Sequence, residues 1–170
     1  MSKSKNAAKA ALVKSGVKAE IEDIRVDRSS ARITLLGVPD VPGVAAKVFS
    51  PLAERGIGVE MIVQNSMRGG MTDIGFLVKK EFLDIAISIT RDVAQEIEAQ
   101  GVSFSTEIAL VSLMGKGLAE DTSMSAGMFK TLAEASVNIE MIVSSSRFIT
   151  CVVGAEKAEK AANALKAAYL

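Results

Sequence analysis

The chain of 170 residues contains no histidine, no tryptophan, one tyrosine and one cysteine. Without histidine it lacks the side chain that most often serves as general acid–base or metal ligand. The few aromatic rings give little surface for stacking bases, and equal numbers of basic and acidic residues, 20 of each, give no basic footprint for nucleic acid. We therefore predict no catalytic residue, no metal, no cofactor and no nucleic-acid partner.

Cys151 is the one cysteine, and it lies in the apolar segment 148–153, where a thiol usually behaves as a small hydrophobe. A disulfide within the chain is excluded, and this usage fits a reducing, cytoplasmic location. No run of 18 apolar residues occurs, so no membrane span is predicted. Residues 1–16 carry lysines and no acidic residue, and we expect a flexible leader there because a signal peptide needs a longer apolar core.

An internal repeat is the strongest positive feature of the sequence. Residues 49–66 and 129–146 read FSPLAERGIGVEMIVQNS and FKTLAEASVNIEMIVSSS, and nine of the 18 aligned positions are identical. The offset of 80 residues is too long for a thin solenoid repeat and suits a small α/β unit. The chain is therefore predicted to contain two copies of one module.

The first copy predicts the order strand, helix, strand, strand, helix, strand, which is the ferredoxin-like plan. Its expected strands are 31–37, 59–63, 72–78 and 102–106, and its first helix is 43–55. Pro51 is expected to remove a hydrogen bond from that helix and bend it. The second helix is expected to bury Phe82, Ile85, Ile89, Val93 and Ile97 and to be capped by Gly101.

The second copy predicts strands 108–114, 138–143 and 147–153 and helices 123–135 and 155–168, so a fourth strand is missing. A spare strand, 17–26, precedes the first copy. We predict an α+β fold of two ferredoxin-like βαββαβ modules, the first inserted within the second. The expected boundaries are 17–26 for the completing strand, 27–106 for the first module and 107–170 for the second.

The loop 37–45 joins a strand to a helix N-terminus and is the clearest candidate ligand site. The first N–H groups of a helix lack intrahelical partners and carry partial positive charge, so they suit a carboxylate. Gly43 allows a close backbone approach, and Asp40 is placed to face an ammonium group. One loop would then bind both charges of a free amino acid. An ordinary turn with a helix cap explains the same residues and stays open as an alternative.

Polar residues at the ends of neighbouring strands are further candidates. Gln64 and Asn65 end one strand on the same edge of the module, and Thr72 offers a hydroxyl. Asn138 begins the equivalent strand of the second copy. Met61 and Met141 are expected to be core residues rather than ligand contacts.

These motifs together resemble the regulatory region of aspartate kinase, which is a pair of ACT domains. The resemblance is carried by GVPDVPGVAAKVF, PLAE, VEMIVQN and TDIGF in the first copy and VNIEMIV in the second. It implies binding of lysine or threonine, feedback inhibition, and a homodimer that packs ACT domains side by side. The sites that it implies, with the loop and strand-end residues above, are Asp40, Pro42, Gly43, Val44, Ala45, Gln64, Asn65, Thr72, Met124, Ser125, Asn138 and Ile139.

Two departures from the family pattern concern the second copy, which has Asp121-Thr-Ser123 in place of a Pro-Gly loop and has Ser146 where the family often has glutamate. The glycine-rich opening of the kinase domain is absent, so we expect a regulatory subunit, a free-standing relative or an excised fragment that acts with a kinase catalytic domain or subunit.

The alternatives are three. A dimerisation module without a surviving effector site is the main rival. An acyl-phosphate hydrolase would need an arginine in loop 37–45, and a metal carrier would need paired thiols on one loop.

Overall fold

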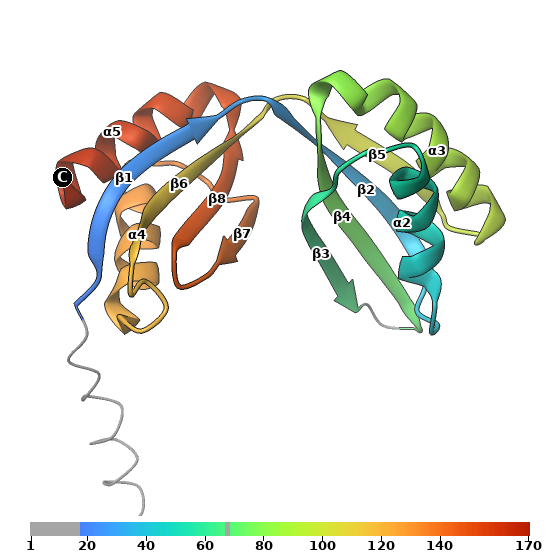
Figure 1. Cartoon of the computed structure of the whole chain (residues 1–170), viewed down its shortest axis with the longest axis horizontal. Helices are drawn as coiled ribbons and strands as arrows, with labels where there is room; N and C mark the ends of the chain where they lie inside the picture. Colours follow the sequence, from blue (N-terminus) through green and yellow to red (C-terminus); the bar gives the residue numbers. More distant parts are fainter. Residues whose placement is uncertain (1–17, 67–68) are drawn as a thin grey trace, which may run out of the picture. The chain divides into compact units, whose positions relative to one another are not determined.

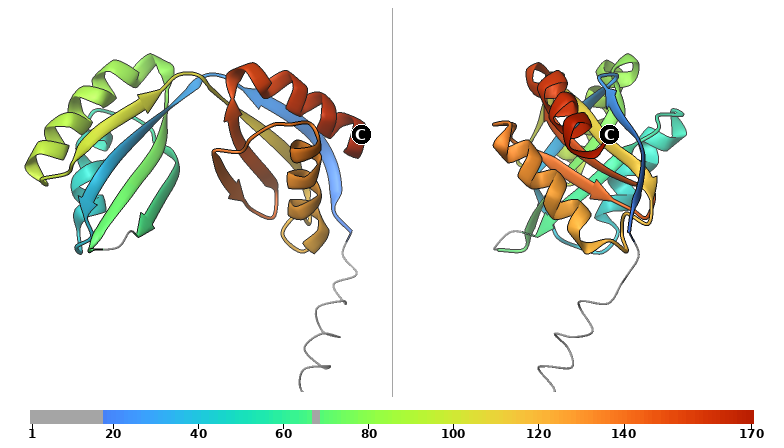
Figure 2. Two further views of the ribbon diagram at one scale, coloured as in Figure 1. Left: turned by 180° about the vertical axis from the view of Figure 1, so that it is seen from behind. Right: turned by 90° about the vertical axis from the view of Figure 1, so that its left-hand side faces the viewer.

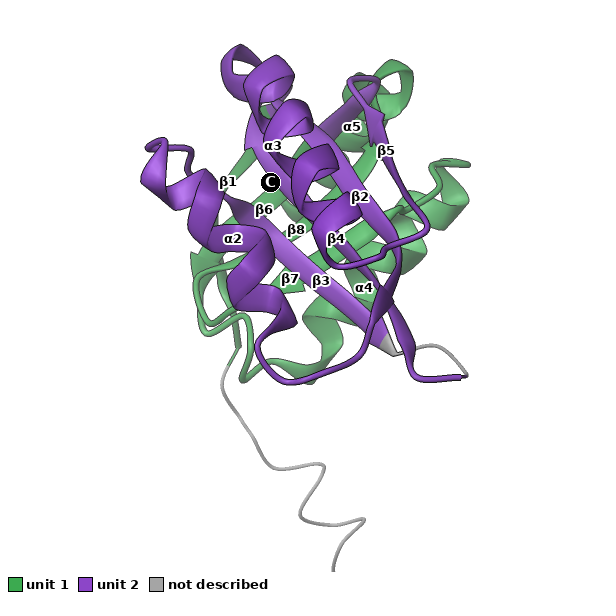
Figure 3. Cartoon of the chain, turned by 90° about the vertical axis from the view of Figure 1, so that its right-hand side faces the viewer, with its two compact units in different colours: residues 1–26, 110–170 green, residues 27–109 purple. Residues whose placement is uncertain are grey.

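The computed structural model describes residues 18–66 and 69–170, which form two compact units. One unit combines the described residues up to Val26 with Leu110–Leu170, and the other is Asp27–Ala109 (Figure 3). Each unit is a four-stranded sheet with two helices on one face (Figures 1 and 2). The leader expected at residues 1–16 lies outside the described residues, as does Arg68 of a predicted turn.

The unit of residues 27–109, called the inserted module below, is formed by one contiguous stretch of chain. Its strands lie in the order β3-β4-β2-β5, with β2 antiparallel to both β4 and β5, and β3 antiparallel to β4. This is the predicted ferredoxin-like arrangement. The elements in chain order are β2 (Ser30–Pro39), α2 (Val44–Glu54), β3 (Glu60–Ser66), β4 (Met71–Lys79), the 3₁₀ helix η1 (Lys80–Phe82), α3 (Leu83–Glu96) and β5 (Gly101–Ser105).

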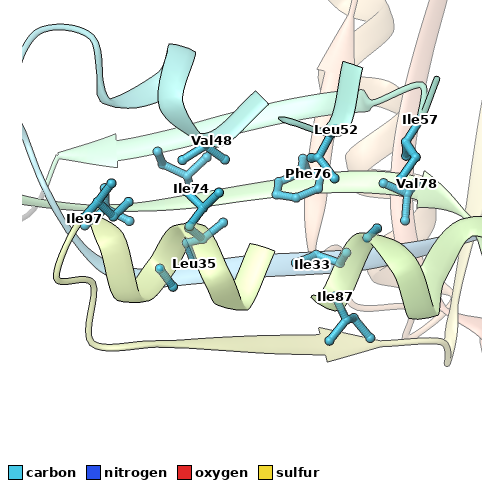
Figure 4. Packing of buried hydrophobic residues seen from close by; sticks show 14 of the residues in the cluster. Ile33, Leu35, Val48, Leu52, Ile57, Ile74, Phe76, Val78, Ile87 and Ile97 are labelled. Carbon is cyan, nitrogen blue, oxygen red and sulfur yellow. The ribbon is translucent and has the colours of Figure 1, made fainter. Parts of the chain in front are cut away.

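The core of the inserted module lies between its sheet and its two helices (Figure 4). Alternate residues of β2, including Ile33 and Leu35, face the helices and are fully buried. Leu52 of α2 is buried against them one turn after Val48, another core position of the helix. The rings of Phe49 and Phe76 meet edge to face with centroids 5.2 Å apart, which ties α2 to β4.

The other unit, called the split module, is assembled from two distant parts of the chain. Its strand order is β1-β6-β8-β7, so β1 takes the place that β5 holds in the inserted module. The N-terminal strand thus completes the second copy, and the predicted insertion of one module within the other is confirmed. The elements are β1 (Glu20–Asp27), β6 (Ile108–Lys116), α4 (Thr122–Glu134), β7 (Met141–Ser144), β8 (Phe148–Gly154), η2 (Ala155–Lys157) and α5 (Ala158–Tyr169).

The predicted buried face of α3 was partly wrong. Val93 and Ile97 are buried, but Phe82 and Ile85 are 37% and 41% exposed. The prediction followed the large apolar residues alone, whereas the helix approaches the sheet through small and medium ones, which shifts its contact face. The buried residues are Leu83, Ala86, Ile87, Thr90, Val93 and Ala94, followed by Ile97 after the helix end.

The strand predicted at 59–63 is interrupted by a bulge at Met61. The pairing of β3 with β4 shifts between Glu60 and Val63, and Met61 has a left-handed φ of 48°. An extra residue in one strand of an antiparallel pair has to leave the extended conformation. The equivalent strand β7 begins at Met141, and the N–H of Glu140 just before it donates to the carbonyl oxygen of Val152, the residue that pairs with Met141.

Three helices end in the same left-handed turn. Gly56 after α2, Glu98 after α3 and Ser136 after α4 have φ of 69°, 58° and 56°. In each case this residue and the next donate N–H groups back to the last turn, as in the Schellman motif. The expected capping of α3 by Gly101 was therefore wrong: Glu98 makes that turn, and Gly101 opens β5.

Candidate functional site

The loop between β2 and α2 is held in place by two hydrogen bonds. The N–H of Asp40 donates to the carbonyl oxygen of Gly70 at 2.8 Å. The N–H of Gly37 donates to Oδ1 of Asp73, also at 2.8 Å, and Gly37 adopts a φ of 57° within a bulge of β2. Both bonds run to the start of β4, so the loop has a fixed shape before any ligand arrives.

The N-terminus of α2 is open. Its N-cap is Gly43, with a φ of 90°, and no side chain caps the helix within the described part of the chain. The Val44 N–H reaches the carbonyl oxygen of Val41 at 3.3 Å, while Ala45 in the first turn is exposed. The exposed carboxylate of Asp40 lies on the same loop. A helix end of this kind presents N–H donors and partial positive charge to an anion.

The N-terminus of α4 in the split module is already occupied by Asp121. Its Oδ1 accepts hydrogen bonds from the N–H and the hydroxyl of Ser123 at 3.0 and 2.6 Å, and its Oδ2 accepts from the N–H of Ala19 at 3.1 Å. The hydroxyl of Ser123 and these N–H groups lower the pKa of Asp121. A carboxylate of the protein itself therefore stands where the inserted module leaves its helix end free.

The end of β3 lies at the same edge of the sheet as this loop, as predicted for Gln64 and Asn65. In the register of the strands Ser66 pairs with Thr72, which in turn pairs with Val38. Thr72 is fully buried, and its hydroxyl donates to the carbonyl oxygen of Asn65 at 2.8 Å. Thr72 therefore fixes the end of β3 beside the loop.

Gln64 and Asn65 are both exposed but lie on opposite faces of the sheet. Gln64 pairs with Ile74, a core residue, and so belongs to the face that carries the helices. Asn65 pairs with Asp73 on the other face. Gln64 thus shares a face with α2 and its open end, while Asn65 contributes its backbone carbonyl on that side through Thr72.

The candidate residues of the split module fall into two groups. Met124 is buried and Ser125 half-buried in the first turns of α4. Asn138 is exposed and Ile139 half-buried in the connection that follows the helix. The 13 residues of α4 correspond to a length of about 20 Å, so the two groups lie at opposite ends of that helix.

Two hollows of the inserted module differ in their position relative to this loop. A hollow of about 220 Å³ adjoins it and is lined by Pro39, Val41, Pro42, Val44, Lys47 and Ile97. A larger hollow, about 460 Å³, lies between α3 and Phe104 of β5 and contains none of the predicted residues. The second hollow is larger and is also lined by carboxylates, those of Asp84 and Asp92, but only the first adjoins the loop and contains predicted residues, so we place the candidate site at the loop.

Two contributors to the site were not foreseen from the sequence. Asp73 fixes the loop by accepting a hydrogen bond from the N–H of Gly37. A single charged residue within an apolar strand could have pointed to such a role in the sequence. Asp121 has the Asp-x-Ser pattern of an N-cap, which residue preferences at helix starts would have identified. Among the described residues, no three acidic or cysteine side chains gather as metal ligands, and no helix has both the length and the apolar character needed to cross a membrane.

Comparison with known proteins gives a consistent result. A family model described as "ACT domain" matches residues 33–92 and 111–169. An aspartate kinase from Pseudomonas fluorescens is 38% identical over 149 residues, which make up 88% of this chain and 36% of that protein. The chain therefore spans about a third of the length of the full-length relatives that it matches.

Two solved structures match over nearly the whole of their chains. The ligand-free crystal structure of the regulatory subunit of aspartate kinase from Thermus thermophilus has a TM-score of 0.84 and 39% identity, covering 88% of this chain and 99% of that one. A crystal structure of aspartokinase alpha and beta subunits matches with a TM-score of 0.83 and 31% identity, covering 88% and 99%. In both cases the similarity includes both modules.

Proposed function

The chain belongs to the ACT-domain family, as the regulatory part of an aspartate kinase, and from this premise we propose that it binds free threonine or lysine and transmits feedback inhibition to a kinase catalytic domain or subunit. The part of aspartate kinase to which the chain corresponds is the regulatory one. The proposal also includes the identity of the effector, a homodimer, a catalytic partner and a cytoplasmic location.

The open N-terminus of α2 is the observation that carries the proposal. The effector carboxylate accepts hydrogen bonds from the first-turn N–H groups, where Gly43 leaves the backbone accessible. The exposed carboxylate of Asp40 receives the α-ammonium group. One short loop, held by two hydrogen bonds that its backbone N–H groups donate, thereby recognises the two charges that every free amino acid carries.

The remaining residues act on the effector side chain. Gln64 stands on the helix-bearing face at the end of β3, and Thr72 fixes that strand end, which includes Asn65. Because Asp121 already occupies the N-terminus of α4, the expectation is one kind of effector site, built on the Asp40 loop. The candidate effector contacts in the split module stay two separate groups in our proposal, Met124 and Ser125 at the start of α4 and Asn138 and Ile139 after its end.

The mechanism proposed is a population shift. An effector that binds one dimer arrangement more tightly than another displaces the equilibrium by its difference in affinity and so restrains the kinase. The structure of aspartokinase alpha and beta subunits, which this chain resembles, supports the expectation of a catalytic partner.

Titration calorimetry of the purified chain with threonine, lysine and methionine tests the proposal. We expect one of the first two to bind, and Asp40→Ala to weaken binding by about 10- to 100-fold, because a charged hydrogen-bond partner is lost. Asp92→Ala, on the exposed surface of α3, serves as the matched control and should bind as the wild type does.

The dimer should survive Asp40→Ala, which is measured by sedimentation on the same samples. If none of the three amino acids gives heat or a thermal shift, the sensing proposal fails. A dimer that persists under that result would instead favour the rival reading of a dimerisation module without an effector site.

A further inference from the structure

The ammonium group of Lys79 lies where three segments of the chain meet, namely the end of β4, residues 27–30 and the start of β3. Lys79 is the last residue of β4, and its Nζ donates to Oδ2 of Asp27 at 3.0 Å, to Oγ of Ser29 at 3.0 Å and to Oγ of Ser30 at 3.3 Å. These three acceptors belong to residues 27–30, the connection through which the chain passes from the split module into the inserted module. Lys79 therefore holds that connection on the end of β4.

Further hydrogen bonds make the connection a defined structure. The N–H and hydroxyl of Ser29 donate to Oδ1 of Asp27 at 2.7 and 2.5 Å, and the N–H of Lys80 donates to the carbonyl oxygen of Ser29 at 2.8 Å. Ser30 is buried. Asp27 is thus shared between its own turn and Lys79, which makes its carboxylate the centre of the connection.

A fourth acceptor lies just beyond hydrogen-bond distance of the same ammonium group. Oε1 of Glu60, the first residue of β3, is 3.8 Å from Nζ of Lys79. An ammonium group has three protons, and all three have acceptors in the connection. For Glu60 to accept a hydrogen bond, Lys79 has to release one of the connection's oxygens. Glu60 and the connection therefore compete for Lys79.

Glu60 lies on the strand whose other end carries the candidate site. The residue after it, Met61, is in the left-handed conformation of the bulge, which is unfavourable for a side chain of this kind. Gln64 and Asn65 end the same strand beside the Asp40 loop. A shift of β3 caused at that end reaches Glu60 through five residues of one strand.

Lys79 has no counterpart in the split module. Lys79 and Gly154 occupy the same place, directly before η1 and η2, but glycine carries no ammonium group. Glu60, by contrast, recurs as Glu140 in the repeated segment. The competition is therefore confined to the module that also has the open helix end.

We propose that Lys79 is a switch point, which holds the connection between the modules in the observed state and is drawn toward Glu60 when β3 moves. The trigger, an effector at the Asp40 loop, rests on the proposed function, whereas the competition itself is a property of the ligand-free chain. Hydrogen bonding to Asp27 raises the pKa of Lys79, and Glu60 acts in the same direction, so the group stays charged throughout.

Hydrogen–deuterium exchange of the full chain without ligand tests the competition. Lys79→Met and Asp27→Asn should each speed exchange of the Ser29 and Lys80 amides by about five-fold, since roughly 1 kcal/mol of local stability is lost. Glu60→Gln should slow the same amides by about two-fold, because the competing charge is gone. Lys116→Met removes a comparable ion pair with Glu22 in the split module and should leave these amides unchanged.

The opposite signs of the variants make the experiment decisive. If Glu60→Gln speeds exchange as Lys79→Met does, or if Lys79→Met has no effect, the proposal is wrong. Threonine and lysine are then added to the wild type and to Glu60→Gln. An effector that binds should speed exchange in the wild type, and this response should disappear in Glu60→Gln while binding persists.

Binding without any change of exchange in the wild type would also overturn the switch. Absence of binding would overturn the proposed effector function instead, and the exchange of the ligand-free variants would still decide whether Glu60 competes for Lys79.

Discussion

The starts of α2 and α4 are equivalent in the two copies of the module, but single residues make them differ. Gly43 opens α2 with a backbone conformation that other residues avoid, although a Cβ there would meet no atom within 4 Å. Asp121 closes α4 with its own carboxylate. The N-cap position therefore lacks a side-chain cap in α2 and carries one in α4.

Cys151 is predicted to be unreactive in the folded protein. It is fully buried in β8, and desolvation raises its pKa from 9.0 to about 12. Because the thiolate is the nucleophile, iodoacetamide at about pH 8 should modify the chain only after denaturant is added. Mass spectrometry of native and unfolded samples measures this, and rapid labelling of the native chain would contradict the burial of β8.

The raised pKa of Cys151 also predicts how the stability of the folded chain depends on pH. The native state binds the thiol proton more tightly than the unfolded chain, so this contribution is complete below about pH 9 and is lost as the pH rises toward 12. Chemical denaturation between pH 8 and 10 should show a fall in stability that is smaller in Cys151→Ala.

At the scale of elements, the three left-handed helix ends differ in how well their residue suits the turn. Gly56 adopts that conformation without cost, whereas Ser136 occupies the equivalent position after α4 with a Cβ that disfavours it. The backbone hydrogen bonds are the same, from Gly56 and Ile57 in one case and from Ser136 and Val137 in the other.

Ser136→Gly is therefore expected to stabilise the split module by about 0.5–1 kcal/mol. The melting temperature should rise by roughly 2–3 °C for a chain of this size. The reverse change, Gly56→Ser, should lower it by a similar amount. Equal melting temperatures for both variants, measured by calorimetry, would show that the turn does not limit stability.

The two modules of the whole molecule differ in how they are connected, and this difference predicts how fragments behave. Residues 27–109 contain every strand and helix of the inserted module, so this fragment should fold alone. Residues 110–170 lack β1 and the first two residues of β6, which leaves the rest of β6 as an exposed edge, and this fragment should be largely unfolded. Circular dichroism and amide NMR spectra of each fragment measure the outcome.

Adding a peptide of residues 18–27 should then restore structure to the fragment 110–170, because the peptide supplies the missing strand. A folded fragment 110–170 without the peptide would mean that β1 is dispensable for the split module.

The sequence by itself determined the repeat, the order of elements and the insertion of one module in the other. Strand and helix periods are local properties, and a missing strand can be counted against a spare one. The sequence also predicted that the loop at Asp40 leads from a strand into a helix N-terminus. Glycine, proline and aspartate at a helix start have specific backbone and charge preferences.

Only the tertiary structure decided which face of α3 is buried, where β3 bulges, how Asp121 closes α4 and which segments share Lys79. Each depends on groups far apart in the chain, such as Ala19 with Asp121 or Asp27 with Lys79. Local patterns cannot specify such pairs, since their geometry is fixed only when the strands align and the helices pack against the sheets.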